Sequence, residues 1–466
     1  MKKFAVILSL LVFLSFPSFS ASPVQATLDS IVGSCLPKGT DAAIMVYDIT
    51  AGQPVYALRE DVMCRPASVQ KVITSIVALN GLGADFQFET RLEMRGELKQ
   101  DGTLDGDIYL VGGLDPALAS SELRKMAQDL KKAGVNRIAG TLYADVSMMD
   151  SIPWGPGWSW DDAPSSYQPF ISALMVDEGS LRVQVVPTRN GQKSDVFLFP
   201  ANRFIKVVNN SVSNVKSAGP LSMDYDWLHD GHTVRIAGNV TKAQSLSFGV
   251  RSSQDFAFSL FREYLDEAGV SYSEFAYGKC PTVTSSVSVV SHPLTQIMKQ
   301  ALKESDNLYA ECMFLRSAYN STGSMTGFTQ AAQYLRQFVD RKFGFDSHNF
   351  NVVDGSGLSM YDFVPPRLLT DLLALIMKDV RNFDIFYTSL PISGVDGTLK
   401  TRMSDKSSIG KIHAKTGSVT GACTLAGYVR NKSGHLLAFA IMNSGAVKMA
   451  PSRKFQDAFC VALSQL

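Results

Sequence analysis

Hydrophobic and polar positions divide the chain into two kinds of pattern. Residues 42–57 alternate as two strands around a glycine turn, and residues 66–79 have apolar positions at helical spacing, with a proline at the start and Gly81 just past the end. Helical spacing returns over 294–319, 328–343, 366–380 and 453–466, and strand alternation covers 411–444. Strands at both ends that enclose helices predict an antiparallel sheet made by the N- and C-terminal segments.

The middle of the chain, from residue 85 to residue 286, has a different pattern. Short alternating segments separated by Gly and Asn turns predict a β-rich unit with one charged helix over 122–132. The clearest predicted strands cover 90–98, 107–111, 181–186 and 232–240. The expected fold class is therefore α/β (α+β), with an antiparallel sheet and helices interrupted by this β-rich unit.

The first residues have the layout of a cleaved secretory signal. Two lysines precede an apolar run over 4–16, which is shorter than the roughly 20 residues that cross a bilayer, and small residues follow. Cleavage after Ser20 or after Ala26 satisfies the small-residue rule at the cut site. We expect a signal over 1–26, no transmembrane anchor and export to the periplasm, with secretion as the alternative.

Composition and charge exclude some classes of function. The 466 residues include 44 Lys and Arg against 43 Asp and Glu, so the clustered basic excess typical of nucleic-acid binders is absent. Six scattered cysteines indicate buried thiols or one to three disulfides, and the histidines form no HExxH pair. The nearest approach to a metal motif, His229-Asp230-Gly231-His232, is expected to be a polar turn, so no metal site is predicted.

Ser68 and Lys71 are the first candidate catalytic residues. Three positions apart at the start of the 66–79 helix, they are expected to lie on one face about one turn apart. A serine hydroxyl needs a base to become a nucleophile, and a lysine with a lowered pKa can be that base. Only this match opens a buried helix; the same Ser-x-x-Lys spacing also occurs at Ser213/Lys216 and Ser408/Lys411.

Two further motifs follow in chain order. Ser305-Asp306-Asn307 interrupts a helical run, and Lys415-Thr416-Gly417-Ser418 lies on an alternating strand, where Gly417 would let a ligand approach the backbone closely. Taken singly, each motif could be a turn or a strand end. Together with Ser68 and Lys71 they form the ordered set Ser-x-x-Lys, Ser-x-Asn, Lys-Thr-Gly.

This set resembles the class C low-molecular-mass penicillin-binding proteins, the D-alanyl-D-alanine carboxypeptidase/endopeptidase family S13 of the penicillin-binding protein 4 type. The 237 positions between Ser68 and Ser305 fit the extra domains that this family inserts there, and the segments 111–116, 354–359 and 390–399 are similar to its other motifs. The resemblance implies a penicillin-binding transpeptidase and serine β-lactamase-like fold. The domain limits that follow are 1–26 for the signal, 27–85 and 287–466 for the catalytic domain, and 86–286 for the insertion.

The resemblance also implies a role for each candidate residue. Ser68 would attack the substrate carbonyl, Lys71 would take its proton and stay neutral beside the charge of Lys415, and Ser305 would protonate the departing amine. The substrate contacts would come from Asn307, Lys415, Thr416, Gly417 and Ser418, with the backbone N–H groups of Ser68 and Ser418 binding the oxyanion.

A carboxylate on the inserted unit would complete the substrate site. Asp145 is expected to reach the active-site rim and bind the amino group of a diamino acid, and an exposed strand-end aspartate is the alternative. The chain departs from the family pattern at Asp362, where Asn is frequent, and at Asp177-Glu178.

The implied partners are peptidoglycan stem peptides and cross-links, β-lactams as covalent inhibitors, and a second copy of the chain. No metal or organic cofactor is implied. Two other functions stay open at this point, a serine β-lactamase or esterase with the same motifs and a non-catalytic wall-binding protein. Intact lysines in two motifs argue against the latter, because a binding module needs neither.

Overall fold

The computed structural model describes residues 23–466, so the predicted signal lies outside the described residues apart from its last four positions. The first described element is α1 (Pro23–Cys35), which the sequence pattern did not indicate. Ala26, one of the two expected cleavage positions, lies inside α1. Over residues 23–466, every helix is too short or too polar to cross a membrane.

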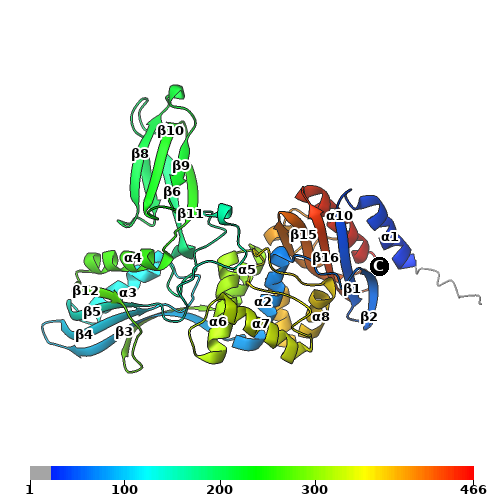
Figure 1. Cartoon of the computed structure of the whole chain (residues 1–466), viewed down its shortest axis with the longest axis horizontal. Helices are drawn as coiled ribbons and strands as arrows, with labels where there is room; N and C mark the ends of the chain where they lie inside the picture. Colours follow the sequence, from blue (N-terminus) through cyan, green and yellow to red (C-terminus); the bar gives the residue numbers. More distant parts are fainter. Residues whose placement is uncertain (1–22) are drawn as a thin grey trace, which may run out of the picture.

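A five-stranded antiparallel sheet joins the two ends of the chain (Figure 1). Its β1 is buried along most of its length because helices pack against both faces of the sheet, α1 and α10 on one side and α8 on the other. The predicted sheet of N- and C-terminal segments is confirmed. Its strands in spatial order are β14 (Ile412–Val419), β15 (Gly421–Arg430), β16 (Leu436–Ala446), β1 (Asp41–Asp48) and β2 (Gln53–Leu58).

The helices beside this sheet surround α2, which is buried on every side over Gln70–Leu79. A helix that is apolar nearly all round belongs in the centre of a domain. The predicted 294–319 helix is two helices, and the predicted 366–380 helix ends at Ile376, where a short connection leads to a further helix that the pattern did not indicate. The buried helix is α2 (Gln70–Leu82), and the helices around it are α5 (Leu294–Lys303), α6 (Asn307–Thr322), α7 (Phe328–Phe343), α8 (Pro366–Ile376) and α9 (Val380–Ser389); α10 (Met449–Ser464) packs with α1 on the other face of the sheet.

The middle of the chain forms a second, mixed sheet with α3 (Ser120–Lys132) and α4 (Ser253–Ala268) packed together beside it (Figure 1). Its strands in order are β12 (Ser271–Tyr277), β5 (Arg137–Asp145), β4 (Thr103–Val111), β3 (Gln87–Leu98) and β13 (Ser285–Pro293). Since β3 follows α2 and β13 precedes α5, their antiparallel pairing brings the entry and exit of this middle part together. The domain limits at 86 and 286 stay predictions.

Two three-stranded sheets project from the middle part (Figure 1). Their strands are β6 (Ser180–Val186), β7 (Asp195–Phe199), β11 (Gln244–Gly249), β8 (Lys206–Ser213), β9 (Ser222–Tyr225) and β10 (Thr233–Val240). Short 3₁₀ turns complete the chain: η1 (Ala67–Val69), η2 (Trp160–Asp162), η3 (Asp177–Gly179), η4 (Lys216–Ala218) and η5 (Gly397–Leu399).

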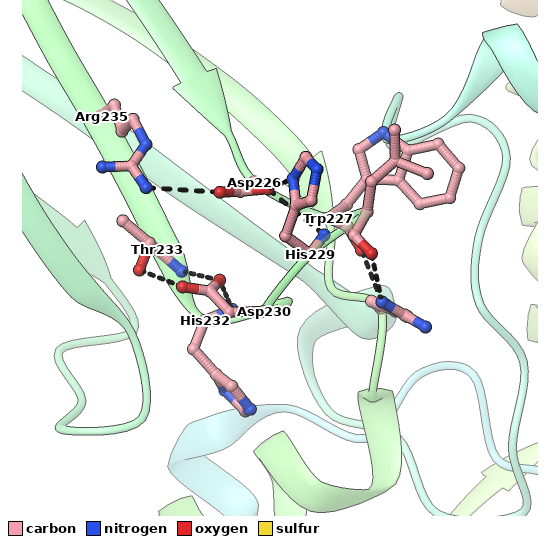
Figure 2. Close-up of polar contacts among 9 residues, drawn as sticks. Asp226, Trp227, His229, Asp230, His232, Thr233 and Arg235 are labelled. Carbon is pink, nitrogen blue, oxygen red and sulfur yellow. Dashed lines mark hydrogen bonds and ion pairs between the residues drawn. The ribbon is translucent and has the colours of Figure 1, made fainter.

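The turn between β9 and β10 contains the one histidine pair that resembled a metal motif (Figure 2). Its carboxylates bind groups of the turn itself: Asp226 Oδ1 lies 2.7 Å from His229 Nδ1, and Asp230 accepts backbone N–H bonds from His232 and Thr233. The Thr233 hydroxyl, which donates to Asp230 at 2.6 Å, and these backbone bonds lower the pKa of Asp230 to about 2. The prediction of a polar turn is confirmed.

All six cysteines are free thiols in the structure. Cys64, Cys312, Cys423 and Cys460 are buried and Cys35 is exposed. The expectation of buried thiols is therefore right for these four, and none of the optional disulfides is formed.

Candidate active site

Ser68 and Lys71 are in direct contact, as their spacing predicts. Lys71 Nζ donates hydrogen bonds to Ser68 Oγ at 3.0 Å, to Asn307 Oδ1 at 2.6 Å and to the Ser356 carbonyl at 2.8 Å. The side chain of Lys71 is fully buried. A buried amine with this set of acceptors is held in one position, with its nitrogen against the serine hydroxyl.

Ser68 lies on the 3₁₀ turn η1 before α2, so the prediction that both residues share a regular helix is wrong in this detail. The turn has an unusual backbone, since Ala67 adopts a φ of +48°. Gly357 packs directly on the Ala67 carbonyl, where a Cβ atom would collide with it. The turn thus presents Ser68 away from the helix axis while Lys71, one turn later, approaches from within the core.

Ser305 and Lys415 form a second serine–lysine pair. Lys415 Nζ donates to Ser305 Oγ at 2.8 Å and to the Thr416 carbonyl at 2.7 Å, and its side chain is also fully buried. Ser305 has a φ of +63° in the connection between α5 and α6, and Asp306 caps α6 through the Tyr309 N–H. The predicted loop between two helices is confirmed.

Strand β14 carries the Lys-Thr-Gly motif past the Ser68 turn. Thr424 on the neighbouring β15 donates to the Pro66 carbonyl at 2.7 Å, and a Cβ atom on Gly417 would lie 3.0 Å from Ser68 N. Only glycine permits this approach of strand and turn. The half-buried Thr416 hydroxyl lies 2.9 Å from Thr398 Oγ1, and the exposed Ser418 hydroxyl accepts a bond from Arg453.

Burial lowers the pKa of both lysines. The pKa of Lys71 falls to about 8, because desolvation outweighs the opposing attraction of Asp354, Glu311 and Asp306. The pKa of Lys415 lies well below its usual range because of burial and the charge of Lys71. The repulsion that was expected to keep Lys71 neutral therefore acts on Lys415 in the unliganded protein.

A cluster of buried carboxylates holds the loop that accepts a hydrogen bond from Lys71. Glu311 accepts the backbone N–H groups of Gly355 and Ser356 at 2.8 Å each, and Asp354 accepts those of Gly357 and Ser359. These bonds hold the loop whose carbonyl receives Lys71 Nζ. Sequence reasoning recorded the 354–359 segment only as a resemblance and missed Glu311, because a lone glutamate within a helix gives no signal.

Asp362 belongs to the same cluster. One of its oxygens accepts the Val353 N–H at 2.7 Å, and burial together with the neighbouring Asp354 raises its pKa well above its usual range. The protonated form is therefore favoured. Asp362 stands where the family frequently has Asn, so a protonated carboxylic acid replaces the neutral amide of Asn at this position.

A loop of the middle part reaches the site. Asn307 Nδ2 donates to the Tyr167 carbonyl at 2.7 Å, and the Tyr167 hydroxyl donates to Asp162 Oδ1 at 2.6 Å. Trp158 Nε1 donates to Asp354 at 2.8 Å, so the loop is bound to the buried cluster as well. Asp162 and Tyr167 border the site, and their distance from the motifs along the chain explains why sequence reasoning missed them.

Asp145 is not exposed, contrary to both interpretations of it. It ends β5 as a buried residue, and its two carboxylate oxygens accept the backbone N–H groups of Ser147 and Cys280, at 2.8 Å each. The bond from Cys280 joins β5 to the segment after β12, and the bond from Ser147 closes a local turn. Among residues 23–466 no hydrogen bond joins Asp145 to the serine–lysine pairs, whereas Asp162 is connected to Asn307 through Tyr167.

The other two Ser-x-x-Lys matches are structural. Ser213 Oγ bonds to the Thr188 N–H and the Ser194 hydroxyl, and Ser408 Oγ donates to the Met403 carbonyl. Both serines are buried away from their lysines. Context separated these matches from Ser68 correctly.

Comparisons with known proteins agree with this geometry. The D-Ala-D-Ala carboxypeptidase 3 (S13) family matches residues 24–466. The chain is 28% identical to the D-alanyl-D-alanine carboxypeptidase DacB of Haemophilus influenzae, over 93% of this chain and 91% of that protein. It is 30% identical to a D-alanyl-D-alanine carboxypeptidase of an Actinomadura species, over 95% and 84%.

Solved structures give the same assignment. The crystal structure of penicillin-binding protein 4 (dacB) from Haemophilus influenzae superimposes with a TM-score of 0.83 and 26% identity, covering 94% of this chain and 99% of that one. The same protein in complex with a novel β-lactam gives a TM-score of 0.77. The chain belongs to the D-Ala-D-Ala carboxypeptidase 3 (S13) family.

Proposed function

We propose that Ser68 is the nucleophile of a serine D-Ala-D-Ala carboxypeptidase and D,D-endopeptidase that cleaves peptidoglycan stem peptides and cross-links. The family assignment gives the serine carboxypeptidase activity itself. The observation that supports Ser68 is the fully buried amine of Lys71, 3.0 Å from its hydroxyl and with a pKa lowered to about 8.

In the proposed acylation step, Lys71 takes the proton of Ser68 as Oγ bonds to the substrate carbonyl carbon. The oxyanion accepts the backbone N–H groups of Ser68 and Ser418. The C–N bond then breaks, and Ser305 gives its hydroxyl proton to the departing amine. Ser305 is reprotonated by Lys415 Nζ, 2.8 Å away. Water hydrolyses the ester and restores the Ser68 hydroxyl.

In this proposal Lys71 and Lys415 share one positive charge, and the lysine that carries it changes when substrate binds. In the unliganded protein the charge is more stable on Lys71, which has carboxylates around it, than on Lys415. A substrate carboxylate bound at Lys415 and Thr416 favours the charged form of Lys415. The charge on Lys415 then makes Lys71 neutral, so binding of the correct substrate prepares the base.

The acyl part of the substrate would lie against Asn307 and the loop over it. We assign the binding of an amino group on the stem peptide to Asp162, whose half-buried carboxylate lies beside Tyr167, in place of Asp145. A carboxylate is the matching partner for an ammonium group.

β-Lactams are proposed to acylate Ser68, as the related protein's complex with a β-lactam suggests. The test is labelling with fluorescent penicillin: wild type should become covalently labelled and Ser68→Ala should not, while Ser324→Ala, an exposed serine elsewhere, should label normally. Absence of label on folded wild type would refute the proposal. Rapid hydrolysis of penicillin would favour a β-lactamase instead.

We also propose that the protein acts in the periplasm after removal of an N-terminal signal. Mass spectrometry of the exported protein distinguishes the two cleavage positions, because a cut after Ser20 leaves α1 whole and a cut after Ala26 removes its first turn. Self-association stays a prediction that sedimentation can test.

A further inference from the structure

A cavity of about 310 Å³ lies beside the Ser305–Lys415 pair. One wall is the polar face of α5, whose residues Gln296, Lys299, Gln300 and Lys303 follow the spacing of a single helix face. The other lining residues are Glu304, Tyr309, Asp396 and Gly397. The size matches cavities that hold small molecules or short peptides, about 300–1,000 Å³.

The position of the cavity connects it to one side of the reaction. Glu304 directly precedes Ser305, the proposed proton donor to the departing amine. Gly397 directly precedes Thr398, whose hydroxyl lies 2.9 Å from that of Thr416, the proposed carboxylate contact. The cavity therefore adjoins the leaving-group side of the scissile bond. Asn307 and the Tyr167 loop border the acyl side.

The charges in the cavity are unequally paired. Lys303 is neutralised, since its Nζ lies 2.7 Å from both Asp396 oxygens and donates to the Leu390 carbonyl. Lys299 is exposed and, among residues 23–466, has no salt-bridge partner within 4.0 Å. Besides this neutralised pair, two exposed charges line the cavity: Lys299 offers a cation to an incoming carboxylate, and Glu304 offers a carboxylate to an amino group of the same peptide.

We propose that this cavity binds the leaving-side stem peptide of a cross-linked substrate, with Lys299 contacting one of its carboxylates. The inference rests on the proposed function, because it takes Ser305 and Thr416 to mark the leaving side. A carboxypeptidase releases only one D-alanine, which the Lys415–Thr416 contact holds alone. Cleavage of a cross-link releases a whole peptide, which needs room beyond that contact.

The test measures the ratio of two activities on purified substrates, cleavage of a cross-linked muropeptide dimer and release of D-alanine from a monomeric pentapeptide. In Lys299→Glu this ratio should fall about five- to tenfold, the size of one lost and reversed charge contact. Lys342→Glu, at an exposed lysine on α7, should keep the wild-type ratio. A second variant, Gln296→Trp, obstructs the cavity from an exposed position and should lower the ratio independently.

Each result separates the two proposals. An unchanged ratio in both variants overturns the role of the cavity, as does a wild type that releases D-alanine but cleaves no dimer, and both results leave the carboxypeptidase standing. A folded wild type that neither binds penicillin nor acts on either substrate overturns the proposed function instead.

Discussion

The surroundings of Lys71 and Lys415 differ although the two residues make the same kind of contact. Each lysine is fully buried and bonds to a serine hydroxyl, at 3.0 Å and 2.8 Å. Lys71 has Asp354, Glu311 and Asp306 near it, whereas among residues 23–466 the one charge that acts appreciably on Lys415 is that of Lys71. The pKa of Lys415 is therefore lowered further.

This comparison shows that burial alone does not assign a lysine its role. A base must be neutral during the reaction, and a carboxylate binder must be charged. In the proposed mechanism, the carboxylate cluster keeps Lys71 protonated until a substrate carboxylate binds at Lys415. Lys415 has no carboxylate of the described residues beside it, and in the proposed mechanism the carboxylate of the substrate pairs with it instead.

Replacing the two lysines separately should give the largest effects and should separate the two roles. In Lys71→Met the rate constant of acylation should fall about 10²- to 10⁴-fold, the range for loss of a general base. In Lys415→Met the larger change should be weaker binding of carboxylate-bearing peptides. Stopped-flow acylation with substrates that have or lack the carboxylate measures both. Equal loss with both substrates in both variants would contradict the division of roles.

The pH dependence of the activity tests whether the carboxylates around Lys71 control its pKa. Because the shared proton is held on Lys71 with a pKa of about 8, kcat/KM should fall as pH rises through about 8, where the free enzyme loses the charge that the substrate would draw to Lys415. Asp306→Asn keeps the helix cap but removes one charge that stabilises the protonated amine. The falling limb should then move to lower pH, by about half a unit to one unit. A shift to higher pH would show that Asp306 does not act on Lys71 in this way.

The smallest expected effect is that of replacing Asp362, which should change the free energy of unfolding. Its raised pKa means that folding retains a proton which the unfolded chain loses above about pH 4, so this residue costs stability as pH rises. Asp362→Asn keeps an acceptor for Val353 N–H and cannot ionise, and should raise the free energy of unfolding by about 1–2 kcal/mol at pH 8.

Urea unfolding at pH 4 and pH 8 measures this difference. The gain should disappear at pH 4, where both proteins are neutral at this position. A variant that is less stable than wild type at pH 8 would mean that the acid is ionised in the folded protein.

Much of the catalytic fold follows from the sequence, because its elements have strong periodicity. The strands around residues 42–57 and 411–444 and the buried helix after Pro66 are found where their patterns predict. The polar residues that interrupt the 294–319 run mark the break between α5 and α6. The helices α1, α4 and α9 were missed, although the apolar positions of α4 and α9 do follow helical spacing.

The candidate site divides in the same way. Ser68, Lys71, Ser305, Asn307 and Lys415 meet as their motifs predict, because each motif is local and its context was recognisable. Glu311, Asp162 and Tyr167 act through tertiary contacts that no spacing encodes. Asp145 was misplaced because a sequence resemblance cannot tell a strand end that is buried by its neighbours from one that is exposed.

The pairing of β16 with β1 has a consequence for the order in which the protein gains activity. Ile44 lies opposite Ile441, so the central sheet closes only after nearly the whole chain has been made. Ser68 leaves the ribosome about 350 residues before Lys415. Contacts this distant in sequence form late and slowly during folding. A nascent or truncated chain therefore carries the proposed nucleophile without the strand proposed to bind substrate, and we expect hydrolysis only when the last strands have joined the first.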